Sequence, residues 1–292
     1  MSTDASPPLA ATGTTPAVAG EGARASRGRR IGASVLRGLN RAWPPVLIVV
    51  LLFAVWEGYV RWKNVDPSVL PTPPDSIRAT IEDWDVIRTD IWVTFQETIV
   101  GLAIAIAVAL IVGLFIDRFE WVRRSVYPVC VASQTIPIVA IAPLMVIWFD
   151  IGLKPKFLLV AFYTFFPIVV GLVQGLAGTD REAMNLLRTM RASRRQILFR
   201  VRFPSALPQL FTGIKITVTY AVVAAVLAEY VGAFDGLGVY MMENRNAFRT
   251  DLVVGAALMT TLMTLALFAV VVLVEKLIMP WYKPVHQGGR WW

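Results

Sequence analysis

The chain has 292 residues, of which 56% are hydrophobic and only 16% are charged. Soluble domains carry roughly 25% charged residues, so this composition indicates a polytopic membrane protein. One cysteine, Cys130, and one histidine, His286, exclude a disulfide framework and a Cys- or His-rich metal site. A formal net charge of +8 is compatible with either nucleic acid or a membrane surface as a partner, and its distribution along the chain separates the two.

Residues 1–42 are rich in Ala, Thr, Ser, Pro and Gly and then in arginine. Such a segment cannot bury enough apolar surface to fold, so we expect a disordered, basic cytoplasmic tail. The apolar run that follows, at about residues 44–60, is too long for the core of a signal peptide and lacks an Ala-x-Ala cleavage site. It is predicted to be an uncleaved first transmembrane helix.

Five further apolar stretches are each long enough to cross a hydrocarbon core of about 30 Å. They lie at about residues 93–116, 126–148, 157–176, 210–231 and 252–278. We therefore expect an all-α polytopic membrane protein with six transmembrane helices, formed by residues 43–284 and followed by a short cytoplasmic tail at 285–292.

The distribution of positive charge predicts the orientation of this bundle. With the N-terminus inside, more than twice as many Lys and Arg residues lie on the cytoplasmic side as on the outside. The positive-inside rule then places both termini in the cytoplasm. It also accounts for the positive net charge without nucleic acid as a partner.

Three loops are expected on the outer side, and the short middle one contains Lys154 and Lys156. In the first, at residues 61–91, the segment 76–84 is predicted to form a short interfacial helix. The last, at residues 234–250, contains Asp235-Gly236-Leu237-Gly238, for which an ordinary turn is the favoured interpretation.

Polar residues within the predicted spans are candidates for a translocation path. Gln134, Thr135 and Pro137 lie in the third span, where proline frees a backbone carbonyl and permits a bend. A simple packing kink is the alternative. In the fifth span, Glu229 is a candidate because a charge in the membrane is costly unless paired, although it can also reach external water.

Aromatic residues suggest a second kind of contact with a solute. Tyr220, with the aromatic residues of the fourth span, can stack on a flat ring, although packing in the core or against lipid is the commoner role. These span residues are Phe162, Tyr163, Phe165 and Phe166.

Residues 179–208 form the longest polar and basic segment inside the apolar part of the chain. Thr179 with Glu182, and Ser193 with Gln196, match the capping-box pattern that begins a helix. Pro204 is expected to end the second helix. Contact with anionic lipid headgroups is one interpretation. Two adjacent capped helices favour a rigid docking surface.

The order Glu182-Ala183, Ala192-Ser193 and Phe203-Pro204, followed by Ala206-Leu207-Pro208, resembles the cytoplasmic "EAA" loop of binding-protein-dependent ABC-transporter permeases. The similarity extends over about residues 70–284. It implies a type I ABC importer fold whose loop inserts into a cleft on an ATP-hydrolysing subunit. The residues that would couple the two subunits are Glu182, Ala183, Arg191, Ala192 and Ser193.

The same resemblance implies the partners and the location. These are a dimer of ABC ATPase subunits, a second permease copy (identical or closely related) and an extracytoplasmic solute-binding protein, all at the bacterial inner membrane. Within this permease family, the chain looks most similar to the branch that imports sulfonates, taurine, nitrate or thiamine precursors. Of these solutes we favour a pyrimidine-like compound. Arg191 occupies the position of the usual loop glycine, so either the turn is built differently or Arg191 pairs with an acidic group on the partner.

Motifs for independent chemistry are absent from the sequence. There is no Gly-x4-Gly-Lys-Ser/Thr phosphate loop, no His-Glu-x2-His zinc helix and no Gly-x-Ser-x-Gly nucleophile elbow. We therefore expect no catalytic residues and no cofactor in this chain, with ATP and Mg²⁺ bound by the partner ATPase. The alternative is a stand-alone secondary transporter or channel, which would need coupling groups and internal repeats that the sequence does not clearly show.

Overall fold

The structure is a computed structural model that describes residues 43–44 and 46–282. The predicted tails at 1–42 and 285–292 lie outside these residues. The chain divides into two compact units, Met1–Trp62 and Lys63–Trp292. A helix runs over residues 46–63, as predicted for the first span, and most of its apolar side chains are exposed.

The described part of the second unit is helical and contains no strand, which confirms the all-α prediction. Its elements are α2 (Pro73–Glu82), α3 (Trp84–Arg118), α4 (Glu120–Ser133), α5 (Ile138–Phe149), α6 (Leu153–Ala177), α7 (Arg181–Thr189), α8 (Arg194–Ile197), the π-helical turn η1 (Leu198–Arg202), α9 (Phe203–Gly232), α10 (Leu237–Asn246) and α11 (Thr250–Ile278).

Four helices of the described chain are long and apolar enough to cross a membrane, namely α3, α6, α11 and the continuous helix Arg194–Gly232. The pair α4 and α5 adds a fifth span if the two are counted together. The helix over residues 46–63 is not among them, and it carries Glu57, Arg61 and Lys63. Judged by length and composition, the described chain therefore has four or five membrane-spanning helices and not the predicted six.

The third predicted span, at residues 126–148, is not one continuous helix, because α4 and α5 cover it with a break between them. α4 and α5 meet at an angle of 100°. Pro137 lacks an N–H group and has an extended backbone with ψ 125°, which starts a new helix at Ile138. Ser133 and Thr135 donate their hydroxyls to the carbonyls of Cys130 and Ala132 at 2.9 and 2.7 Å. The Ala132 carbonyl also accepts from the Thr135 N–H at 3.0 Å, so hydroxyl and backbone donors together occupy carbonyls at the break.

The core of the second unit lies between α3, α6 and α9. α6 and α9 approach closely because Gly171 and Gly175 present no side chain to α9. A Cβ atom on Gly175 would lie 2.7 Å from the Ala206 carbonyl, and one on Gly171 would lie 2.8 Å from the Gln209 carbonyl. Small residues four apart let membrane helices pack backbone to backbone.

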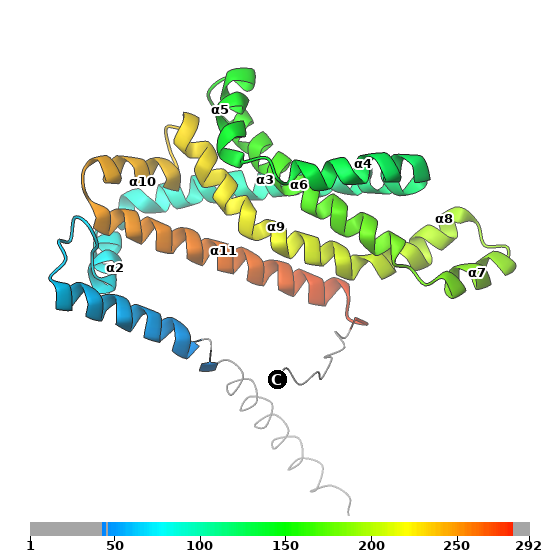
Figure 1. Cartoon of the computed structure of the whole chain (residues 1–292), viewed down its shortest axis with the longest axis horizontal. Helices are drawn as coiled ribbons and strands as arrows, with labels where there is room; N and C mark the ends of the chain where they lie inside the picture. Colours follow the sequence, from blue (N-terminus) through cyan, green and yellow to red (C-terminus); the bar gives the residue numbers. More distant parts are fainter. Residues whose placement is uncertain (1–42, 45, 283–292) are drawn as a thin grey trace, which may run out of the picture. The chain divides into compact units, whose positions relative to one another are not determined.

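The long helices place two clusters of short elements far apart. α2 and α10 gather at one end of α3, α9 and α11, whereas α7 and α8 extend from the other end (Figure 1). We refer to these as the α10 end and the α7 end.

Candidate functional site

At the α7 end, the first short helix begins one residue later than the sequence pattern suggested. The Asp180 carboxylate accepts a hydrogen bond from the Glu182 N–H at 2.8 Å and caps α7. Thr179 instead donates its hydroxyl to the Leu176 carbonyl at 3.1 Å. The predicted Thr179–Glu182 capping box is therefore wrong, because the Thr179 hydroxyl satisfies the last turn of α6 and leaves the cap to the next residue.

The second capping box is confirmed. Ser193 Oγ accepts from the Gln196 N–H at 3.3 Å, and Gln196 Oε1 accepts from the Ser193 N–H at 2.8 Å. The predicted stop at Pro204 is wrong, because α8 passes through the π turn into α9 as one helix. Pro204 directly follows the π turn, in which the Phe203 N–H donates to the Leu198 carbonyl five residues back, and the helix continues past this residue without an N–H group.

Arg191 adopts the backbone conformation that glycine favours, with φ 60°. Its N–H donates to the Arg188 carbonyl at 3.0 Å, and the Ala192 N–H donates to the Leu187 carbonyl at 3.0 Å. This pattern is a Schellman motif, which normally has glycine at this position. The turn therefore has the geometry that a glycine would give, although Arg191 occupies the position. Among the described residues no carboxylate pairs with Arg191.

α7 presents an exposed stripe formed by Glu182, Leu186 and Met190, spaced four residues apart. Leu186 and Met190 are 63% and 71% exposed. Ala183 is half-buried, and α7 has no buried residue. An exposed amphipathic stripe of this kind is suited to docking on a protein partner.

The base of this hairpin is fixed to the membrane helices by one arginine. Arg202, in the π turn, donates two hydrogen bonds to Asp117 of α3 at 2.7 and 2.8 Å. It donates a third to the Leu176 carbonyl at the end of α6, at 2.9 Å. A bidentate guanidinium–carboxylate pair fixes orientation as well as distance, so the second arm of the hairpin is held in one orientation to α3 and α6.

At the α10 end, three consecutive N–H groups at the start of α10 are bound by side chains of α3 and α9. The Gly236 N–H donates to Asp90 at 2.8 Å, Leu237 to Thr94 Oγ1 at 2.9 Å and Gly238 to Glu229 at 2.6 Å. Thr94 in turn donates its hydroxyl to Glu229 at 2.6 Å. The turn predicted at Asp235–Gly238 is confirmed only in its first half, because residues 234–236 bend whereas Leu237 and Gly238 already belong to α10, the helix that these side chains cap.

Two glycines make the approach of Glu229 possible. Gly236 has φ 122°, and a Cβ atom there would lie 2.2 Å from Glu229 Oε1. A Cβ atom on Gly238 would lie 2.5 Å from the Val226 carbonyl. Glu229 has no exposed surface, so in this structure it serves as a buried cap and does not face open solvent. Its role as a path residue stays a prediction.

A buried ion pair lies beside this cap. Lys156 of α6 donates to Glu97 of α3 at 2.6 Å, and their side chains are 6% and 1% exposed. Glu97 Oε2 has no hydrogen-bond partner among the described residues. The sequence alone does not predict this pair, because Lys156 is expected in an outer loop and Glu97 lies 59 positions away, so only the packing of α6 on α3 brings them together.

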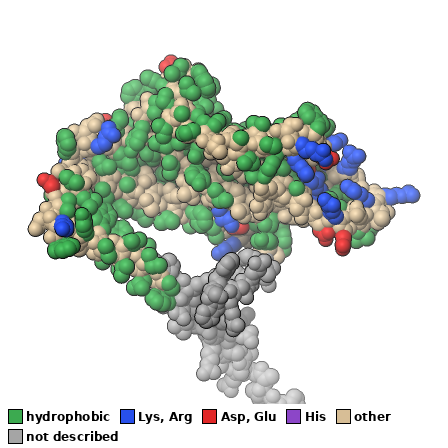
Figure 2. Space-filling view, viewed as in Figure 1, with side chains coloured by type: hydrophobic (Ala, Val, Ile, Leu, Met, Phe, Trp, Pro, Cys, Tyr) green, Lys and Arg blue, Asp and Glu red, His purple; other side chains and the backbone are tan. Residues whose placement is uncertain are grey.

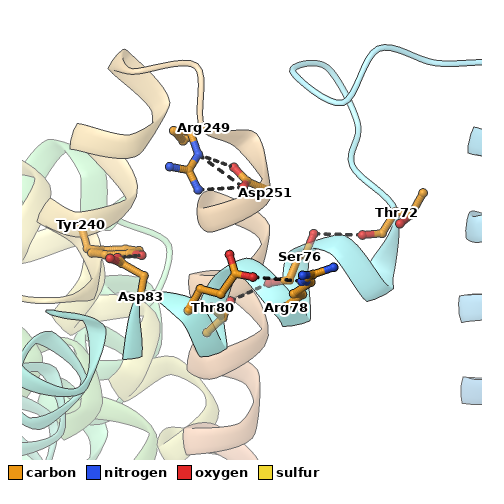
Figure 3. Close-up of polar contacts among 9 residues, drawn as sticks. Thr72, Ser76, Arg78, Thr80, Asp83, Tyr240, Arg249 and Asp251 are labelled. Atoms are coloured by element: carbon orange, nitrogen blue, oxygen red, sulfur yellow. Dashed lines mark hydrogen bonds and ion pairs between the residues drawn. The ribbon is translucent and has the colours of Figure 1, made fainter. Parts of the chain in front are cut away.

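Further contacts at the α10 end join α10 to the junction of α2 and α3 (Figure 3), and α2 packs on α11. The Tyr240 hydroxyl donates to Asp83, between α2 and α3, at 2.5 Å. Burial and the Asp83 carboxylate both raise the pKa of Tyr240 above its usual value. The Thr80 hydroxyl donates to the Ser76 carbonyl at 2.7 Å within α2, the helix predicted for 76–84.

The remaining path candidates lie where α4 and α5 break. Gln134 and Tyr220 line one hollow of about 130 Å³, together with Ser133, Phe162, Tyr163, Phe166 and Pro167. The rings of Tyr163 and Tyr220 meet edge to face, with centroids 6.0 Å apart. Thr135 and Pro137 are exposed in the adjoining break. The structure thus brings Gln134 and Tyr220 together and places Glu229 elsewhere.

Comparison with known proteins identifies what the chain is similar to. Residues 101–284 match the family model described as "Binding-protein-dependent transport system inner membrane component". The chain is 34% identical to the formylaminopyrimidine transport permease protein ThiX of Halalkalibacterium halodurans, over 83% of this chain and 97% of that protein.

Two further similarities extend this result. The riboflavin transport system permease protein RibX of Chloroflexus aurantiacus is 32% identical, over 84% of this chain and 94% of that protein. The fold is similar to a chain of the inward-facing MetNI methionine ABC transporter, with a TM-score of 0.57 and 21% identity. That match covers 66% of this chain and 96% of the other.

Replacing Glu229 by Ala should lower the free energy of unfolding by about 1–3 kcal/mol, because the Gly238 N–H and the Thr94 hydroxyl lose their acceptor in a buried place. Thermal unfolding of the purified protein in detergent measures this. Glu229→Gln should remain close to wild type, since its amide can accept from Gly238 and donate to Thr94. Glu243→Ala, an exposed change on α10, is the matched control. Equal stability of the Ala and Gln variants at position 229 would contradict the capping role.

Replacing Arg191 by Gly should stabilise the protein by roughly 1 kcal/mol, because the left-handed conformation is costly for a residue with a Cβ atom. Arg191→Ala removes the charge but keeps the Cβ atom, so it should bring no such gain. Comparing the apparent unfolding temperatures of the two variants separates the steric effect from the effect of charge. A gain of equal size in both would show that charge repulsion, rather than backbone strain, is relieved.

Proposed function

Since the chain belongs to the family of binding-protein-dependent inner-membrane transport components, we propose that two copies of it form the path of an ATP-driven importer. As a permease component it spans the membrane several times. In the proposed complex both termini are cytoplasmic, an ATPase subunit lies beneath each copy, and an extracytoplasmic binding protein delivers the solute. The second copy is the same chain or a close relative.

The observation that carries this proposal is the capped hairpin at the α7 end. Its exposed stripe of Glu182, Leu186 and Met190 offers an apolar docking face with an acidic start. Its second arm is continuous with a membrane-spanning helix, and Arg202 clamps that arm to Asp117. A rigid element that contacts a partner at one end and the bundle at the other can transmit the partner's motion. ATP and Mg²⁺ are assigned to that partner.

The solute proposed for this chain is a small planar heterocycle. The hollow at the α4–α5 break has about 130 Å³. That is several times the volume of about 30 Å³ that a water molecule occupies in the liquid. Four aromatic residues from α6 and α9 line it and can stack on a ring, and Gln134 can donate and accept a hydrogen bond at the ring edge. The names of ThiX and RibX both refer to compounds with aromatic heterocycles, which supports this solute class.

We expect Glu182→Arg to prevent recovery of the ATPase and to abolish ATP-driven uptake, because it reverses the charge at the start of the docking helix. The measurement is a pull-down of the tagged chain from its native membrane in mild detergent, with mass spectrometry of the co-purified proteins. Glu82→Arg on α2 is the control, since it makes the same charge reversal at the opposite end.

Wild type and Glu82→Arg should both bring down an ATPase with a phosphate loop, whereas Glu182→Arg should be recovered at the same level alone. An ATPase retained by Glu182→Arg would remove the docking role of α7. Solute flux that needs no ATP would favour a stand-alone transporter over an importer subunit.

We expect Tyr220→Ala to reduce ATP-driven uptake of a planar heterocyclic solute by about 3- to 10-fold, which is the contribution of one aromatic contact. The assay is uptake into vesicles that contain the complete complex and saturating binding protein. Phe268→Ala, an exposed aromatic truncation on α11, is the matched control. Uptake that is unchanged by Tyr220→Ala, with ATPase recovery intact, would exclude this hollow from the path while leaving the importer assignment in place.

A further inference from the structure

A second, larger hollow lies at the α7 end between the hairpin and the ends of the membrane helices. It has a volume of about 920 Å³. We call it the arginine hollow, because six arginines line it: Arg118, Arg123, Arg188, Arg194, Arg195 and Arg202. Blue side chains gather over this end of the molecule in the space-filling view (Figure 2).

The positive charge of the arginine hollow is not balanced within the described chain. Asp117 is the only acidic residue in its lining, and it is already bound by Arg202. The other five arginines form no ion pair among the described residues. Arg118 and Arg195 lie over the rings of Phe119 and Phe199, which are neutral partners. Five like charges around one cavity repel each other, so an anion bound there would relieve this repulsion.

The walls of the arginine hollow are amphiphilic. Beneath the arginines lie the apolar side chains Leu114, Leu176, Ile197 and Leu198. Arg202 Nε is buried and has no hydrogen-bond partner among the described residues, so one donor remains at the wall. An anionic group attached to an apolar body matches this arrangement better than a free ion does.

The arginine hollow lies at the ends of membrane-spanning helices, where the membrane boundary is expected. α3 ends at Arg118, α4 begins at Glu120 and α6 ends at Ala177, and all three helix ends border it. Ends of spanning helices lie at the level of the lipid headgroups. Basic pockets between such helices are suited to anionic headgroups.

The two faces of α7 separate this hollow from the docking stripe. Met184 and Arg188 line the hollow, whereas Glu182, Leu186 and Met190 do not. Residues 184 and 188 lie about 200° around the helix from 182 and 186, on the opposite side. A protein docked on the exposed stripe therefore leaves the hollow available.

We propose that the arginine hollow binds a phosphate group, and that its source is the headgroup of an anionic phospholipid. Arg123 and Arg194 are the main contacts, since neither guanidinium group forms a hydrogen bond or an ion pair within the described chain. A lipid held there would lie between α7 and the bundle and would steady the hairpin in its docking position. The site does not depend on the solute or on the ATPase proposed above.

The test measures binding of fluorescent phosphatidylglycerol to the purified full-length chain in detergent, with phosphatidylcholine as the zwitterionic reference. Arg123→Gln/Arg194→Gln should weaken phosphatidylglycerol binding roughly 30-fold, since each arginine near a headgroup contributes to affinity by a factor of several. Arg123→Lys/Arg194→Lys keeps the charge and should lose much less.

The matched control is Arg181→Gln/Arg200→Gln, which removes the same amount of charge at the α7 end from two arginines outside the hollow. This pair should bind phosphatidylglycerol nearly as well as wild type. An equal loss in both double variants would show general attraction to a basic surface and overturn the site. So would equal affinity of wild type for the two lipids.

Inorganic phosphate distinguishes the two sources of the ligand. If it displaces phosphatidylglycerol only at concentrations far above those of the lipid, the headgroup is the ligand. If it binds wild type tightly and the Gln variant weakly while the lipid does not bind, the phosphate site stands and the lipid source is wrong. If only an acidic partner protein binds, and neither phosphate compound does, the proposal fails.

Discussion

Backbone N–H and C=O groups near the hydrocarbon core must find partners inside the protein, and this constraint explains where the chain departs from simple straight spans. At the α10 end, Asp90, Thr94 and Glu229 bind three successive N–H groups of one short helix. Because these side chains come from α3 and α9, the cap also joins two membrane helices to the segment between α9 and α11. The same constraint is met by hydroxyls at the α4–α5 break.

Local sequence patterns predicted the parts of the structure that local chemistry controls. The apolar stretches gave the spans formed by α3, α6, α9 and α11, and the Ser193–Gln196 box gave the start of α8. The pattern failed at Thr179 because Asp180 offers a competing cap one residue later. The expectation that Pro204 ends a helix failed because a π turn directly precedes this proline and the helix continues through it. Such an irregular turn cannot be predicted from the presence of a proline alone.

Contacts between distant segments could not be predicted in the same way. Lys156 and Glu97 are 59 positions apart, and no local pattern links them. The Asp235-Gly236-Leu237-Gly238 sequence is typical of a turn, and only the proximity of Glu229 shows why glycine is needed at two of its positions. Charged residues in apolar stretches were the available signal. They identify candidates for pairing but do not say which carboxylate meets which donor.

Arg191 shows how a docking element can tolerate strain. Its left-handed conformation is unfavourable for an L-residue, yet it closes the Schellman turn that sets α7 against α8. The cost is offset by capping at both helix starts and by the Arg202–Asp117 clamp, which together leave the hairpin few other arrangements. A hairpin fixed in this way keeps its exposed stripe and its basic face on opposite sides. One short helix can then contact a protein with one face and an anion with the other.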